Sequence, residues 1–250
     1  MSTVTGQKPS KVRAKRAIRL PDRADEEKRI VLPDVGWEVY DLLSASLRDG
    51  SPIRMTYDGK DLEIMTTSDI HDNFRSLMGL IVHEVTVALD IPHTGSGSTT
   101  WKRPEIARGL EADDSFYFRV EKFPIVAAAR KRRAMDIADY PNPDLAIEGD
   151  ISPPEVDRED IYKKLKVEEI WYFDGKEVTI KRLGEHGNDA VAEQSQFLPI
   201  KAVEIRRWLV EEDSNDRVAW TLRLRAWCRR VARTRKPATR RPRRRKAGDK

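Results

Sequence analysis

The chain has few of the residues that build several common kinds of functional site. It contains one cysteine, Cys228, and four histidines scattered through 250 residues. A single cysteine excludes a disulfide framework within the chain and favours a reducing compartment. Four scattered histidines and one cysteine do not make a zinc site. Any catalytic chemistry is therefore expected from carboxylates and basic side chains.

Long apolar runs are missing as well. No run approaches the roughly 18 residues that a membrane-spanning helix requires. The first 20 residues are basic but lack the apolar core of a secretory signal. We therefore expect a cytoplasmic protein that does not contact membranes.

Charge is abundant and unevenly placed. Residues 1–19 hold 6 Lys or Arg and no acid, residues 221–250 hold 14 Lys or Arg and one acid, and the net charge is only +5. The body between these ends is therefore strongly acidic. Basic arms of this kind are typically disordered or bind a partner, and they raise non-specific affinity for nucleic acid. We expect a flexible basic arm over residues 1–30 and a disordered basic tail over 234–250.

The body carries clear local signals. Apolar spacing predicts helices over 37–50, 68–90, 157–167, 200–212 and 216–235. Hairpins are expected over 53–65 and 168–183, each around an Asp-Gly turn. Further strands are expected over 114–120 and 143–150, with a loop over 94–100. These elements predict an α+β (α/β) protein.

The strand over 143–150 carries acids in an alternating pattern. Asp144, Glu148 and Asp150 fall on one face, and Leu145 and Ile147 fall on the other. A solvated strand face is the ordinary interpretation of such a row. This strand, however, lies between segments that are expected to form the core, so we expect it to be central. Acids facing helices there need a partner, because burying an unpaired charge is costly.

A bound Mg²⁺ would provide that partner, since it is held by one or two carboxylates. A second acidic cluster, containing Glu111, Asp113 and Asp114, begins the strand expected over 114–120. An acid from each of two adjacent strands is a common way to build a magnesium site for phosphodiester cleavage. The spacing alone suggests such a site and does not specify it.

Four segments in order resemble the Uma-two family, restriction-endonuclease-like proteins of the PD-(D/E)XK nuclease superfamily. They are PIRMTYDGKDLEIMTTSDIH, GSTTWKRPEIARGLEADDSFYF, PDLAIEGDIS and REDIYKKLKVEEIWYFDGKEVTIKRL. The resemblance covers about residues 31–215 and leaves a C-terminal helix over 216–233. It implies a restriction-endonuclease-like mixed sheet flanked by helices. It also implies cleavage of nucleic acid with Mg²⁺ or Mn²⁺, and DNA is the expected substrate.

The resemblance assigns roles to individual residues. Asp113 matches the Asp of the family's PD motif and Glu148 the acid of the following strand, so both are expected to hold metal, with Asp150 assisting. Ala112 stands where the family usually has proline. The superfamily signature places Lys where this chain has Asp150, which leaves Arg158, on the next helix, as the best-placed cation. Arg158 could contact the scissile phosphate but stays protonated, so it could not be the general base.

Two further groups are candidates. His71 begins the helix over 68–90 on its buried side, where it would either support the metal site or serve as a capping or core residue. The basic run Arg130, Lys131, Arg132 and Arg133 is the one basic cluster expected near the proposed site, and it is expected to contact nucleic acid. Two functions stay open: a metal-dependent endonuclease, and a nuclease-derived module that binds nucleic acid without turnover. A homodimer is also left open.

Overall fold

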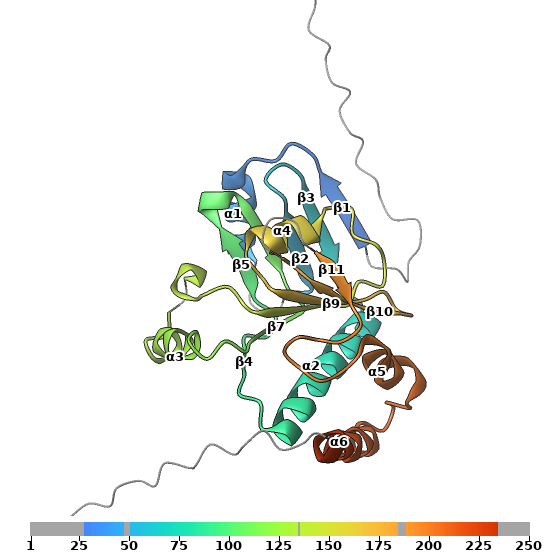
Figure 1. Ribbon diagram of the computed structural model, residues 1–250. Helices are drawn as coiled ribbons and strands as arrows, with labels where there is room; N and C mark the ends of the chain where they lie inside the picture. The colour runs from blue at the N-terminus through green and yellow to red at the C-terminus, as the bar shows by residue number, and fades with distance from the viewer. Residues whose placement is uncertain (1–27, 48–50, 135, 185–188, 235–250) are drawn as a thin grey trace, which may run out of the picture.

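A computed structural model describes residues 28–47, 51–134, 136–184 and 189–234 (Figure 1). The described chain is an α+β fold, which confirms the expected class. Its α-helices are α1 (Trp37–Ser46), α2 (Asp69–Leu89), α3 (Phe123–Lys131), α4 (Arg158–Lys164), α5 (Ala202–Arg206) and α6 (Arg217–Thr234). Short 3-10 turns occupy Pro104–Ile106 and Ile137–Asp139, and a π-helical turn, Arg207–Glu211, continues α5.

The strands form two sheets rather than the single sheet that was expected. Sheet A has the order β1-β3-β2-β6-β5 and sheet B the order β11-β10-β9-β8-β7-β4. The pairs of sheet A are antiparallel, and sheet B is mixed because β8 and β9 are parallel. The strand bounds are β1 (Lys28–Leu32), β2 (Ile53–Tyr57), β3 (Leu62–Thr66), β4 (Thr94–Gly95), β5 (Thr100–Arg103), β6 (Arg108–Glu111), β7 (Asp114–Tyr117), β8 (Leu145–Glu148), β9 (Glu169–Phe173), β10 (Val178–Arg182) and β11 (Ala190–Ala192).

Sheet B lies between two packed layers. One face, with Leu145 and Ile147, packs in a large core against α2, α5 and α6. The other face, with Ala146 and Ile170, packs in a second core with α4 and with side chains of sheet A. Figure 1 shows α2, α5 and α6 below sheet B, and sheet A with α1 above it. The strand over 143–150 is therefore central and has one apolar face, as the alternation predicts.

Local sequence signals account for the principal elements. Ser68 caps α2 through its hydroxyl, which accepts a hydrogen bond from the His71 amide at 3.2 Å, and Asp90 ends the helix in the left-handed region. Both predicted hairpins form, with β2 paired to β3 and β9 paired to β10. Gly59 and Gly175 adopt the positive φ values that their tight turns require.

Three segments differ from expectation. Residues 28–30, assigned to the flexible arm, belong to β1, which pairs with β3; residues 1–27 and 235–250 lie outside the described part of the chain. The segment over 94–100 is not wholly a loop, because its ends contribute to β4 and β5. Helix α3 was not predicted. Its last turn holds Arg130 and Lys131, so this segment was interpreted as a basic run and not as an amphipathic helix.

No helix among the described residues is both long enough and apolar enough to cross a membrane.

Candidate active site

Asp113 lies where the chain passes from sheet A to sheet B. Strand β6 ends at Glu111 and β7 begins at Asp114, so Ala112 and Asp113 form the link. Asp114 is paired with Ile147, which is the last pair of the antiparallel β7–β8 ladder, so Asp113 comes next to the Glu148 end of β8. The two carboxylates that were predicted to meet therefore lie at the same end of sheet B, with His71 of α2 against Asp113 and Tyr162 of α4 against Glu148.

Asp113 is buried and held by two groups. Its Oδ2 accepts a hydrogen bond from the Gly149 amide at 2.7 Å, and Nε2 of His71 lies 3.0 Å from the same oxygen. His71 is fully buried in the first turn of α2. Burial acts to raise the pKa of Asp113, but the hydrogen bond and charge of His71 and the Gly149 amide outweigh it, so this pKa is lowered.

Glu148 ends β8 and is fully buried. Its Oε2 accepts from Nη1 of Arg158 at 2.8 Å, and its Oε1 accepts from the Tyr162 hydroxyl. Both donors come from α4, which begins where Asp157 accepts from the Asp160 amide at 3.0 Å. Positions four apart on a helix lie on one face, so Arg158 and Tyr162 reach Glu148 together.

Asp150 completes the acidic end of the strand, and two arginines bind it. Arg158 donates to its carboxylate at 3.0 and 3.1 Å, and Nη2 of Arg29 donates at 2.8 Å. Arg29 comes from β1 and also donates to Ser152. The assisting acid predicted by resemblance is thus engaged by cations of the protein itself.

Glu63, on β3, is the fourth buried acid. Its Oε1 accepts from Arg29 at 2.8 Å and from Arg158 at 3.4 Å, and its Oε2 accepts from the Glu155 amide at 2.7 Å. Neither Glu63 nor Arg29 was predicted. Glu63 alternates with Leu62 and Ile64, as a solvent-facing strand residue would, and Arg29 falls in a basic stretch. Arg29 is 121 residues from its partner Asp150, and Glu63 is 95 residues from Arg158. No local signal in the sequence could therefore have revealed either residue.

We call Glu63, Asp113, Glu148, Asp150, Arg29 and Arg158 the acid cluster. Its four carboxylates and two guanidiniums give a formal charge of −2, or −1 if the adjacent His71 is protonated. Burial raises the pKa of Glu148 to about 8, and the charges of Asp113 and Asp150 add to the rise while Arg158 opposes it. The excess negative charge of the cluster therefore favours a proton on Glu148 as long as no cation is bound.

The acid cluster suits a divalent cation by charge and by donor type. Carboxylate oxygens are the ligands that Mg²⁺ and Mn²⁺ prefer, and the excess negative charge matches one such ion. The described residues nevertheless include no group of three or more His, Cys, Asp or Glu side chains already arranged as metal ligands. The reason is the direction of the carboxylates: those of Glu148 and Asp150 point at Arg158.

The position of Arg158 differs from its expected role. It is only 4% exposed, and its hydrogen bonds go to acids of the cluster. Burial acts to lower the pKa of Arg158, but the carboxylates of Asp150 and Glu148 outweigh it and raise this pKa well above the ordinary value. Arg158 thus faces the acids in this arrangement and does not project outward toward a phosphate.

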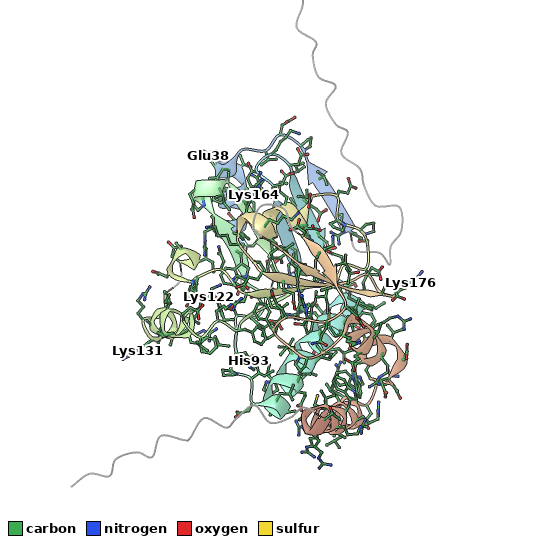
Figure 2. All side chains as sticks on the ribbon, in the orientation of Figure 1. Glu38, His93, Lys122, Lys131, Lys164 and Lys176 are labelled. Atoms are coloured by element: carbon green, nitrogen blue, oxygen red, sulfur yellow. The ribbon has the colours of Figure 1, made fainter. Side chains whose placement is uncertain are left out.

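The basic run over 130–133 is not near the acid cluster. Asp113 precedes β7, whereas α3 follows it, so the run lies at the opposite end of the strand. Figure 2 shows the labelled Lys131 out on α3 and Lys164 on α4, well apart. Within the run, Arg130 donates to Thr94 at 2.8 Å and Arg132 to Asp139 at 2.6 Å. The sequence interpretation that placed these residues beside the acids was wrong, although contact with nucleic acid remains a prediction.

Asp144, the third acid of the predicted row, lies at the other end of β8. Its Oδ2 accepts from the amides of Phe118 and Arg119 at 2.6 and 2.7 Å, and its Oδ1 accepts from Nζ of Lys122. These contacts hold the turn that follows β7. Asp144 shares the predicted face but takes no part in the acid cluster.

Comparison with known proteins adds no identification: the chain matches no family model, and no curated protein is significantly similar to it.

Proposed function

We propose that this protein is a nuclease dependent on a divalent cation, Mg²⁺ or Mn²⁺, that cleaves phosphodiester bonds in nucleic acid, with DNA as the expected substrate. The observation that carries the proposal is the charge of the acid cluster. Four buried carboxylates against two guanidiniums leave an excess that one divalent cation would balance. The motif resemblance and the basic ends of the sequence favour nucleic acid as the substrate.

In this proposal Asp113 and Glu148 hold the cation. The Gly149 amide and His71 orient Asp113, and Tyr162 orients Glu148. Arg158 would release Glu148 when the cation enters, while its contacts to Asp150 and Glu63 keep it in place. A bound Mg²⁺ supplies Lewis-acid stabilisation of phosphoryl oxygens and activates water. The buried side chains of the protein exclude water and are already held in position by their hydrogen bonds.

A second function is favoured by one observation. The contacts of Arg158 and Arg29 already pair Glu148, Asp150 and Glu63 without any metal. Arginine, unlike the superfamily's lysine, cannot act as a base. A nuclease-derived module that binds nucleic acid without cleaving it is therefore the alternative.

A cleavage assay separates the two functions. Wild type and Glu148→Gln are incubated with supercoiled plasmid, single-stranded DNA and RNA, in Mg²⁺, Mn²⁺ or EDTA. The proposed nuclease cleaves at least one substrate with metal, loses cleavage in EDTA, and loses it in Glu148→Gln. Wild-type activity no greater than that of Glu148→Gln in either metal would overturn the proposal, and binding without cleavage would then support the alternative.

A matched control guards against general effects of replacing glutamate. Glu168 is half-exposed and pairs with Arg119 near the Asp144 end of the sheet. Glu168→Gln makes the same chemical change away from the acid cluster, so it should cleave as wild type does. Binding of Mn²⁺, followed by calorimetry without substrate, should be lost in Glu148→Gln and retained in Glu168→Gln.

A further inference from the structure

A cavity of about 480 Å³ lies beside the acid cluster, on the outer side of Arg158. Its walls come from the loop and first turn of α4, residues 154–159, and from the exposed strip of β9 and β10. The volume falls within the range of small-ligand sites. None of the functions considered above uses this cavity.

Two residues, Arg158 and Tyr172, connect the cavity with the acid cluster. Arg158 lines the cavity and donates to Glu148 and Asp150. Tyr172, which also lines the cavity, is paired with Glu148 across the β8–β9 ladder. A ligand group in this cavity would therefore lie next to the carboxylates proposed to hold the cation.

The chemistry of the lining suits a flat, uncharged ring. The Tyr172 ring forms one wall, and Pro154 and Val156 add apolar surface. Nζ of Lys181 lies over the Tyr172 ring, 5.5 Å from its centre, in a cation–π contact, so a base that stacks there would move this ammonium toward its partner Glu159. Aromatic side chains beside a cationic group are the usual platform for stacked bases in proteins that bind single strands.

The charged groups of the lining disfavour a phosphate inside the cavity. The carboxylates of Glu155, Asp157 and Glu159 outnumber the cations Arg158 and Lys181. Glu159 also pairs with Lys181, so that ammonium is not available to an anion in this arrangement. A nucleobase, which is neutral and can donate from its amino groups to a carboxylate, fits this lining better than the sugar-phosphate chain does.

We propose that this cavity is a nucleobase subsite, in which a base stacks on Tyr172 while its phosphodiester lies at the acid cluster. This inference rests on the proposed function in taking nucleic acid as the ligand. A base can enter only when it is unpaired, so the preferred substrate is single-stranded or has a base turned out of the duplex.

The test uses the full chain in EDTA, so that binding is measured without cleavage. The ligand is a labelled single-stranded DNA 12-mer (about 12 nucleotides, within the length that one such groove covers) carrying one 2-aminopurine, compared with its duplex. Tyr172→Leu should weaken single-strand binding roughly ten- to a hundred-fold and abolish quenching of the 2-aminopurine. Tyr172→Phe should keep both, and duplex affinity should change little in either variant.

A second ring serves as the matched control. Tyr140 is half-buried near α3, where its hydroxyl donates to the Ala134 carbonyl at 3.2 Å. Tyr140→Leu should bind the single strand as wild type does, and thermal unfolding of each variant reports whether it is folded. The subsite proposal is overturned if wild type and folded Tyr172→Leu bind the single strand with equal affinity. It is also overturned if Tyr172→Leu loses affinity equally for the single strand and the duplex. If binding depends on Tyr172 but neither wild type nor any variant cleaves, the subsite proposal stands and the nuclease proposal fails.

Discussion

The two ends of strand β8 each bury a carboxylate, and they differ in what surrounds it. At the first end, Asp144 is satisfied by two backbone amides and by Lys122, which keeps contact with solvent. At the other end, Glu148 and Asp150 share Arg158 with Glu63, and the acids outnumber the cations. Burial and strand face are the same at both ends. The hydrogen-bond and ion-pair partners therefore distinguish Asp144, which holds a turn, from Glu148 and Asp150, which belong to the candidate site.

The largest contrast is expected in cleavage. Glu148→Gln should lower the rate by roughly two orders of magnitude or more, because a metal-holding charge is lost. Asp144→Asn keeps an acceptor oxygen for the Phe118 and Arg119 amides, so the folded variant should cleave at the wild-type rate. Single-turnover cleavage of the best substrate measures both. Equal rates for the two variants would remove the functional distinction between the ends of the strand.

Removing the shared cation should have the largest effect on stability. Arg158→Ala leaves Glu148, Asp150 and Glu63 buried without their common partner, and loss of one member of a buried pair costs about 3–5 kcal/mol of unfolding free energy. The matched control is Arg119→Ala, which breaks an exposed pair with Glu168 and should cost at most about 1 kcal/mol. Urea unfolding measures both. Similar losses would show that the cluster does not depend on Arg158.

Removing Asp144, the acid that holds the turn after β7, should lower the free energy of unfolding less than removing Arg158 does. Asp144→Ala leaves two half-buried amides without an acceptor and separates Lys122 from its partner. The free energy of unfolding should fall by about 1–3 kcal/mol, and amide exchange at Arg119 should become faster. Unchanged exchange there would mean that the turn after β7 is held by other contacts.

The last contrast is a dependence of stability on pH in EDTA. The pKa of Glu148 is raised to about 8 in the folded state from an ordinary value of 4.5. Between these values the folded state binds the extra proton, so the unfolding free energy should decrease as pH rises from about 5 to 8. The lowered pKa of Asp113 acts only below its ordinary value of 3.8, outside this window. Thermal unfolding of Glu148→Gln should show a flatter profile, and identical slopes would contradict the charge assignment.

Much of the fold was predictable because its signals are local. The Asp-Gly turns, the Ser68 cap and the apolar stripe of α2 each depend on neighbours within a few residues. The alternation in β8 correctly predicted a central strand with one apolar face. Helix α3 was missed because its last turn lies in the basic run over 130–133, and strand β4 was missed because 2 residues carry too little pattern.

The candidate site was only partly predictable. Asp113 and Glu148 were found from alternation and motif resemblance, and the hydrogen bond from the Gly149 amide to Asp113 places Asp113 beside the end of β8. Arg29 and Glu63 come from sheet A, whose approach to the end of β8 no short stretch of sequence encodes. The basic run over 130–133 was misplaced for the same reason. Its distance from the acids depends on the direction of β7.

The sequence by itself therefore determined the longest helix, both hairpins, the apolar and acidic faces of β8, and the identity of its carboxylates, because side-chain periodicity follows directly from backbone geometry. Only the tertiary structure decided which acid is an anchor and which belong to the cluster. That decision depends on donors brought from strands and helices up to 121 residues away. The energy of a buried charge is set by the partners that surround it, and those partners are assembled only when the two sheets pack together.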